Sequence, residues 1–133
     1  MSAERALLAA IRETALQCGP LQALLSDRIY DDPPADAVFP YLTLGRVESR
    51  PTDAASRDAL EHAITLHAWS RHGGRAETLD IIAALRGALH NAQPVVSGHK
   101  LVLLLATFAD VFRSGDGRTT HGVLRLRAIT EPE

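Results

Sequence analysis

Apolar residues recur at the spacing of an amphipathic helix in two segments of the chain. The first segment follows Ser2, a good helix cap, and ends at Gly19-Pro20, which stops a helix. The second begins after Gly73-Gly74 and runs to about His90, and a short helical turn is predicted at residues 21–25. On a helical wheel each apolar set falls within an arc of about 100° to 120°. The two sets are Leu7, Leu8, Ile11, Ala15 and Cys18, and Thr78, Ile81, Ile82, Leu85, Ala88 and Leu89.

Two other segments alternate apolar and polar residues, which is the period of a β-strand. They cover residues 39–47 and 60–70, and Pro40 is expected at the start or on an edge of the first strand. In the second strand, His62 lies among the apolar residues of one face. The segment between them, residues 49–58, is polar and contains a proline, and it is predicted to be a loop.

The last third of the chain has the pattern of a long β-hairpin. Residues 101–113 and 118–130 flank a four-residue turn, Ser114-Gly115-Asp116-Gly117. Pairing Arg113 with Arg118 gives a register in which one face is almost wholly apolar, and a slip of one residue would mix that face. In this register Leu101, Leu103, Leu105 and Thr107 lie opposite Thr130, Ala128, Leu126 and Leu124.

The order of these elements is helix, two strands, helix, two strands. It predicts an α+β fold, a mainly antiparallel sheet of about four strands with two helices on one face and a long C-terminal hairpin. No helix is left to cover the second face, so we expect either oligomerisation or the loops at about 31–38 and 49–58 to cover it. The residues expected on that face are Val102, Leu104, Phe108, Phe112, Val123 and Ile129, beside several arginines.

Composition narrows the class of protein. The chain has 133 residues, of which 46% are hydrophobic, which predicts one ordered domain without room for a second of ordinary size. The formal net charge of −2 argues against a dedicated DNA-binding protein, and no apolar run is long enough to span a bilayer. Cys18 is the sole cysteine, so an intramolecular disulfide is excluded. Arginine supplies every basic residue except Lys100. This bias suits pairing at an interface, and a genome rich in G and C would produce the same bias.

The polar residues do not form a known catalytic motif. The six histidines lack metal-ligand spacing, and the phosphate-binding and nucleophile-elbow motifs are absent. Asp31-Asp32 and Gly73-Gly74-Arg75 are interpreted as a solvated loop and a helix start. An enzyme would need a site assembled in space, for which His67, Asp110 and His121 are the candidates. The sequence therefore predicts no enzyme, no metal and no cofactor.

Three groups of motifs resemble those of one known family. They are RIYDD at 28–32 with FPYLTLG at 39–45, HAWSR at 67–71 with GRAE at 74–77, and SGHKLV at 97–102 with DGRTTHGVLR at 116–125. In this order and spacing they are similar to the tail-completion family of long-tailed phages, prophages and gene transfer agents. The resemblance runs from about residue 5 to residue 131.

The resemblance implies a single domain over residues 1–133 that is similar to the phage tail terminators. Such proteins form a ring, typically of six copies, on the head-proximal end of the finished tail tube. The ring ends tube polymerisation and joins tail to head, and DNA passes through its lumen without specific binding. The implied partners are other copies of the chain, the major tail tube protein and the head–tail connector protein. The implied location is the virion tail, after assembly in the bacterial cytoplasm.

The family brings no catalytic residues, so candidate contact residues come from charge alone. A near-neutral chain with an uncovered sheet face and arginine-rich edges suits contacts between subunits. A near-neutral or acidic lumen would also let DNA pass. The alternative is a small homo-oligomeric α+β module that binds a ligand or protein and has no phage role. The candidates for pairs between subunits are Arg46, Arg71, Arg75, Arg113, Arg118, Arg125 and Arg127.

Overall fold

The helices begin and end close to where the sequence predicts. The computed structural model describes residues 1–55 and 57–133, and within them it has three helices. α1 (Ala3–Leu16) starts at Ser2, whose hydroxyl accepts a 3.1 Å hydrogen bond from the Arg5 backbone N–H. α2 (Gly19–Leu25) is a full helix of seven residues where a single turn was predicted. α3 (Ala76–Leu89) buries Thr78, Ile81, Ile82, Leu85 and Leu89.

The strands form one mainly antiparallel sheet. β2 (Tyr41–Thr52), β3 (Ala59–Ser70), β5 (Thr120–Pro132) and β4 (His99–Arg113) are neighbours in that order. The short β1 (Ile29–Tyr30) adds a fifth strand, parallel to β2, at the first edge. The predicted α+β class, the antiparallel sheet and the C-terminal hairpin are therefore confirmed. No helix in the described part of the chain is long and apolar enough to cross a membrane.

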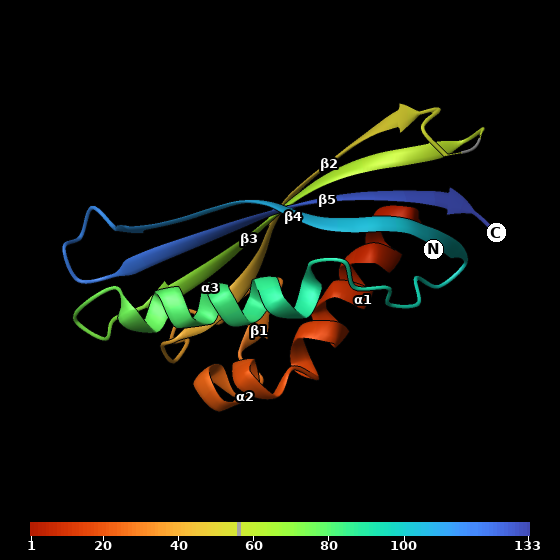
Figure 1. Ribbon diagram of the computed structural model, residues 1–133. Coiled ribbons are helices and arrows are strands. Elements are labelled where there is room, and N and C mark those ends of the chain that lie inside the picture. Colours follow the sequence, from red (N-terminus) through yellow and green to blue (C-terminus); the bar gives the residue numbers. More distant parts are fainter. Residues whose placement is uncertain (56) are drawn as a thin grey trace.

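All three helices lie on the same side of the sheet, and the core fills the space between the two layers (Figure 1). α3 approaches β5 closely because Gly122 has no side chain. A Cβ at that position would lie 2.8 Å from Thr78 Cγ2 and 2.9 Å from Ile82 Cγ1. Within the described residues no helix covers the other face of the sheet, as predicted.

The predicted loop at residues 49–58 is wrong over its first part, because β2 continues to Thr52. Its polar side chains pair with side chains of β3, since Arg50 bonds Glu61 and Ser49 bonds His62. Pro51 is tolerated because β1 pairs with β2 at its beginning, so this part of β2 is an edge. Ser56, which the prediction also included, lies outside the described residues.

The predicted hairpin register is wrong over most of its length. Arg113 lies opposite Thr120 rather than Arg118, and the turn spans residues 114–119. Asp116 closes this longer turn, because its carboxylate accepts hydrogen bonds from the backbone N–H groups of Arg118 and Thr119 at 2.9 and 2.8 Å. These bonds lower the pKa of Asp116 to about 2.

Two β-bulges in β4 then restore the predicted pairing at Leu101 and Thr130. The bulges also move residues between faces. Leu104, predicted on the uncovered face, is fully buried against the helices instead. Leu103 and Leu105, predicted on the apolar face, pair with Ile129 and Arg127 and lie on the uncovered face. The core residues predicted for β5 are confirmed, namely Leu124, Leu126, Ala128 and Thr130.

Candidate functional site

The uncovered face of the sheet gathers most of the chemically distinctive side chains. One end of this face is aromatic and the other is charged. Phe39, in the segment before β2, contacts the aromatic end, where its ring centre lies 5.1 Å from that of Tyr41. Of the residues predicted on this face, Phe108 and Phe112 are exposed, whereas Val123 and Ile129 are buried by their neighbours. We take the exposed part of the face as the candidate functional surface.

An aromatic ladder crosses four strands at the first end. It consists of Tyr41 on β2, Trp69 on β3, His121 on β5 and Phe112 on β4, and Phe112 is 41% exposed. The Trp69 and His121 rings stack with centres 4.0 Å apart, and the Phe112 ring centre is 4.9 Å from His121. Trp69 Nε1–H donates a 3.0 Å hydrogen bond to Thr43 Oγ1, which fixes the indole. The ladder is a rigid, partly apolar surface.

The structure brings two of the three predicted enzyme candidates together within this ladder. His67 Nδ1 lies 2.8 Å from His121 Nε2, so one imidazole donates and the other accepts. Burial lowers the pKa of both histidines, and the neighbouring charge of His67 lowers the pKa of His121 further. The Asp110 carboxylate, on β4, acts in the opposite direction and raises the pKa of His121. Over residues 1–55 and 57–133 no group of three His, Cys, Asp or Glu side chains could hold a metal ion.

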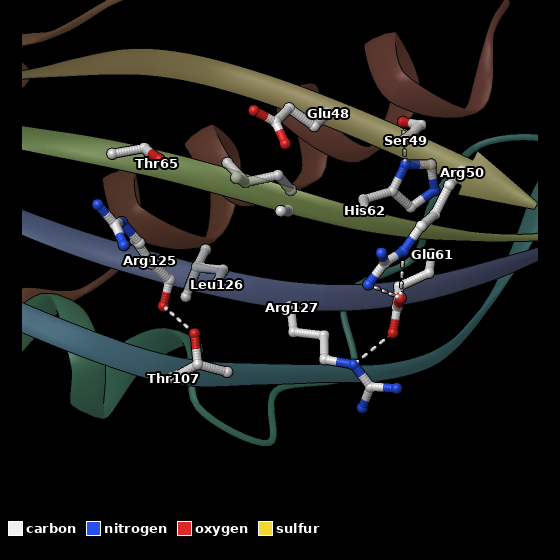
Figure 2. A pocket seen from close by; sticks show the side chains of 12 residues that line it. Glu48, Ser49, Arg50, Glu61, His62, Thr65, Thr107, Arg125, Leu126 and Arg127 are labelled. Atoms are coloured by element: carbon white, nitrogen blue, oxygen red, sulfur yellow. Dashed lines mark hydrogen bonds and ion pairs between the residues drawn. The ribbon is translucent and has the colours of Figure 1, made fainter. Parts of the chain in front are cut away.

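A groove of about 490 Å³ occupies the charged end of the face. Figure 2 shows Glu61 between Arg50 and Arg127, with hydrogen bonds from both guanidinium groups. The bond from Arg127 is the main cause of the lowered pKa of Glu61, and the bond from Arg50 adds to it. Arg125 stacks on Phe108, with its guanidinium carbon 4.6 Å from the ring centre. The groove is therefore lined by fixed charges, and the exposed Phe108 ring lies next to it through its contact with Arg125.

A buried histidine lies beside the groove on the helix side of β3. His62 Nδ1 is 2.7 Å from Ser49 Oγ (Figure 2). On the other side of the ring, Nε2 is 2.8 Å from Thr130 Oγ1. Burial lowers the pKa of His62, while the nearby Glu4 carboxylate acts in the opposite direction. The sequence places His62 among apolar residues, and the structure shows that both ring nitrogens have hydroxyl partners there.

The seven arginines chosen from the sequence fall into two groups. Three lie on or beside the uncovered face. Arg46, at the bulge of β2, pairs with Glu48 at 2.9 Å, whereas Arg125 and Arg127 line the groove. Arg127 is held by Glu61, so its charge is already balanced within the chain.

The other four arginines lie at the end of the sheet that carries the β4–β5 turn. Arg71 bonds Thr119 and stacks on Phe39, and Arg113 donates to the Gly117 carbonyl at 3.0 Å. Arg75, at the start of α3, and Arg118, in the turn, are exposed and have no ion pair within the described residues. The sequence did not predict the aromatic ladder, because its members become neighbours only through the order of the strands.

The class of protein is an α+β fold with helices on one face of the sheet, and the exposed aromatic and charged side chains on the other face are typical of a surface for protein contacts. The family model for the tail completion protein gp17 matches residues 5–131. The chain therefore belongs to the family of tail completion proteins, and the predicted resemblance is confirmed. It is 29% identical over 127 residues to tail completion protein gp17 of Bacillus phage SPP1, covering 94% of this chain and 92% of that protein.

Solved structures agree with the family assignment. A chain in the virion of a native gene transfer agent particle superposes with a TM-score of 0.90 at 25% identity, covering 98% of each chain. The structure of bacteriophage SPP1 gp17 superposes with a TM-score of 0.62 at 26% identity, covering 95% of this chain and 89% of gp17. The chain is thus a structural tail completion protein of the phage and gene transfer agent type.

Proposed function

We propose that six copies of this chain form a closed ring on the head-proximal end of the tail tube. The ring ends tube polymerisation and gives the head–tail connector protein a surface to bind. One observation carries this proposal: nearly the whole chain has the fold of a protein found in a gene transfer agent virion. Closed cyclic symmetry is the usual way in which identical chains assemble.

The open face supports a role in assembly. Phe108 and Phe112 are 45% and 41% exposed on it, and large exposed aromatic side chains are typical of protein contact surfaces. The seven arginines remain our candidates for contacts between copies. The net charge of −2 supports a lumen that lets DNA pass without retaining its phosphates.

Light scattering over a range of protein concentrations tests the ring directly. Six chains of 14.4 kDa have a mass of about 86 kDa, and a closed ring keeps that mass on dilution. If the isolated protein is a monomer, its binding to purified tail tubes is measured by co-sedimentation instead. A stable dimer that ignores tail tubes would overturn the proposal and favour the small binding module.

Electron microscopy of particles made without this chain tests whether it ends tube polymerisation and joins tail to head. We expect tubes of uncontrolled length that lack heads, and supplying the chain should restore a fixed length and head attachment. Tubes of normal length in its absence would contradict the proposed role in ending polymerisation, whatever the mass of the isolated protein.

A further inference from the structure

We propose that neighbouring copies join head to tail, with the β4 edge of one copy against the β1 edge of the next. This inference rests on the proposed ring and names the surfaces that build it. The two edges lie on opposite sides of the sheet, whose order is β1-β2-β3-β5-β4. A contact between two different surfaces closes into a ring when the rotation fits.

The first surface lies along β4 and the adjacent flank of α3. On α3, Ala84 faces α1 and α2, since the Cys18 thiol lies 4.0 Å from its carbonyl oxygen. At 100° per residue, Leu79 and Arg86 point to the opposite flank. That flank lies toward β4, because α1 packs against β2 at the other side of the sheet. Leu79 is 51% exposed there.

β4 adds residues on the same side. Ala109 and Arg113 alternate with Phe108 and Phe112, so they lie on the helix side of the strand, and both are exposed. β4 is also the last strand of the sheet, so its outer edge has no strand partner within the described chain. We call this the β4-edge surface. It consists of Arg75, Leu79, Arg86, Ala109 and Arg113.

The second surface lies at the other edge, around β1 and the segments that flank it. Asp27 precedes β1, while Asp31, Asp32 and Asp36 follow it, and all four are exposed. None of these aspartates has an ion pair among the residues that the structure describes. Val38, in the same segment, is 63% exposed. We call these five residues the β1-edge surface.

Charge and apolar exposure make the two surfaces complementary. The β4-edge surface has three arginines around Leu79, and the β1-edge surface has four aspartates near Val38. Asp110 lies beside the first surface. Arg12 and Arg28 lie near the second, where their guanidinium groups bond the Ile29 and Pro40 carbonyl oxygens, and Arg71, which pairs with Asp116, lines the same hollow as Asp36 and Val38. Opposite charges therefore face each other when edge meets edge. This contact leaves both the helix layer and the open sheet face free for the tube, the connector and the lumen.

Charge reversal on each edge tests the contact. One variant carries Arg86→Glu and Arg113→Glu, and the other carries Asp31→Arg and Asp32→Arg. Each alone places like charges across every contact, so we expect ring formation to weaken by about tenfold or more. In an equimolar mixture the two variants alternate around a ring of even order, and every contact again joins opposite charges. The mixture should recover the wild-type mass.

A control separates this effect from net charge and from misfolding. Arg5→Glu with Arg57→Glu changes the net charge as much as the first variant does, at exposed positions outside both edges. It should assemble like the wild type, and circular dichroism should show that every variant folds. If the wild type assembles on tail tubes alone, the same samples are compared by co-sedimentation.

The outcomes distinguish the edge contact from the ring itself. A wild-type ring that both reversed variants also form would overturn the edge contact and leave the ring in place. Rescue of a reversed variant by the wild type, but not by the other variant, would show a contact between identical edges and overturn the head-to-tail arrangement. A wild type that forms no ring, alone or on tubes, would overturn both proposals.

Discussion

At the residue scale, the close approach of α3 to the sheet depends on a single hydrogen atom at Gly122. A Cβ there would lie within 3.0 Å of three atoms of Thr78 and Ile82, which belong to the packed core. We expect Gly122→Ala to lower the free energy of unfolding by about 1–3 kcal/mol, because the helix must shift to admit a methyl group. Urea unfolding followed by circular dichroism measures this change.

Gly87 provides the matched control, because it lies on the exposed side of α3 with open space around it. Gly87→Ala should raise the free energy of unfolding by about 0.5–1 kcal/mol, since alanine favours the helix. Equal effects of the two substitutions would contradict the close packing of α3 on β5.

At the element scale, the success of the predictions follows the strength of the local pattern. α1 and α3 have long apolar stripes, Ser2 caps α1 and Gly73-Gly74 precedes α3, so their bounds could be predicted within a few residues. β4 is different, because its two bulges shift the strand by single residues. Residues 101–105 are all apolar, so both faces of the strand look alike and no sequence signal indicates a bulge. Leu104 therefore could not be assigned to the core from the sequence.

The candidate surface could be predicted only in outline. The count of helices and strands predicts an uncovered face, and the motifs predict the family. The aromatic ladder depends on β5 lying between β3 and β4, which places His121 between Trp69 and Phe112. Strand order is set by packing of the whole sheet, so no local pattern shows it.

The ladder also makes the protonation of His121 measurable by tryptophan fluorescence. Trp69 is the sole tryptophan, and it stacks on His121 at 4.0 Å. A protonated imidazole quenches an excited indole, so fluorescence should fall as His121 gains a proton. Burial and His67 lower the pKa of His121, so the midpoint of this quenching should lie below the ordinary value of 6.5.

A pH titration of tryptophan fluorescence measures the midpoint on the folded protein. His121→Gln should weaken the transition while circular dichroism remains unchanged, and His67, whose ring centre lies 5.9 Å from that of Trp69, should account for the quenching that remains. A midpoint above 6.5 in the wild type would contradict the buried histidine pair, since it would mean that the folded protein favours the charged ring.

At the scale of the whole molecule, the two faces and the two edges of the sheet differ in what they contact. The helix layer and the inner face of the sheet form the core, and the outer face offers aromatic and charged groups. The two edges carry opposite charges in our proposal for the ring. This separation lets the isolated chain stay folded while both edges and one face remain exposed.

Stability of the folded chain should depend on pH because its buried histidines are neutral. Burial lowers the pKa values of His62, His67 and His121 from 6.5, so the unfolded chain binds more protons in the range just below that value. The free energy of unfolding should therefore be highest above about pH 6.5 and fall as the pH drops below it. Glu4, Glu61 and Asp116 have lowered pKa values, and their contribution is lost only below their ordinary values of 4.5, 4.5 and 3.8.

Urea unfolding at a series of pH values between about 8 and 5 isolates the histidine effect from that of the carboxylates. His62→Gln keeps a polar group between Ser49 and Thr130 but removes one titrating site, so its stability should change less steeply with pH below 6.5. Thr130→Val leaves the histidine in place and serves as the control for a lost hydrogen bond. If His62→Gln and the wild type show the same slope, His62 is protonated equally in the folded and unfolded chains, and its burial does not contribute to the pH dependence.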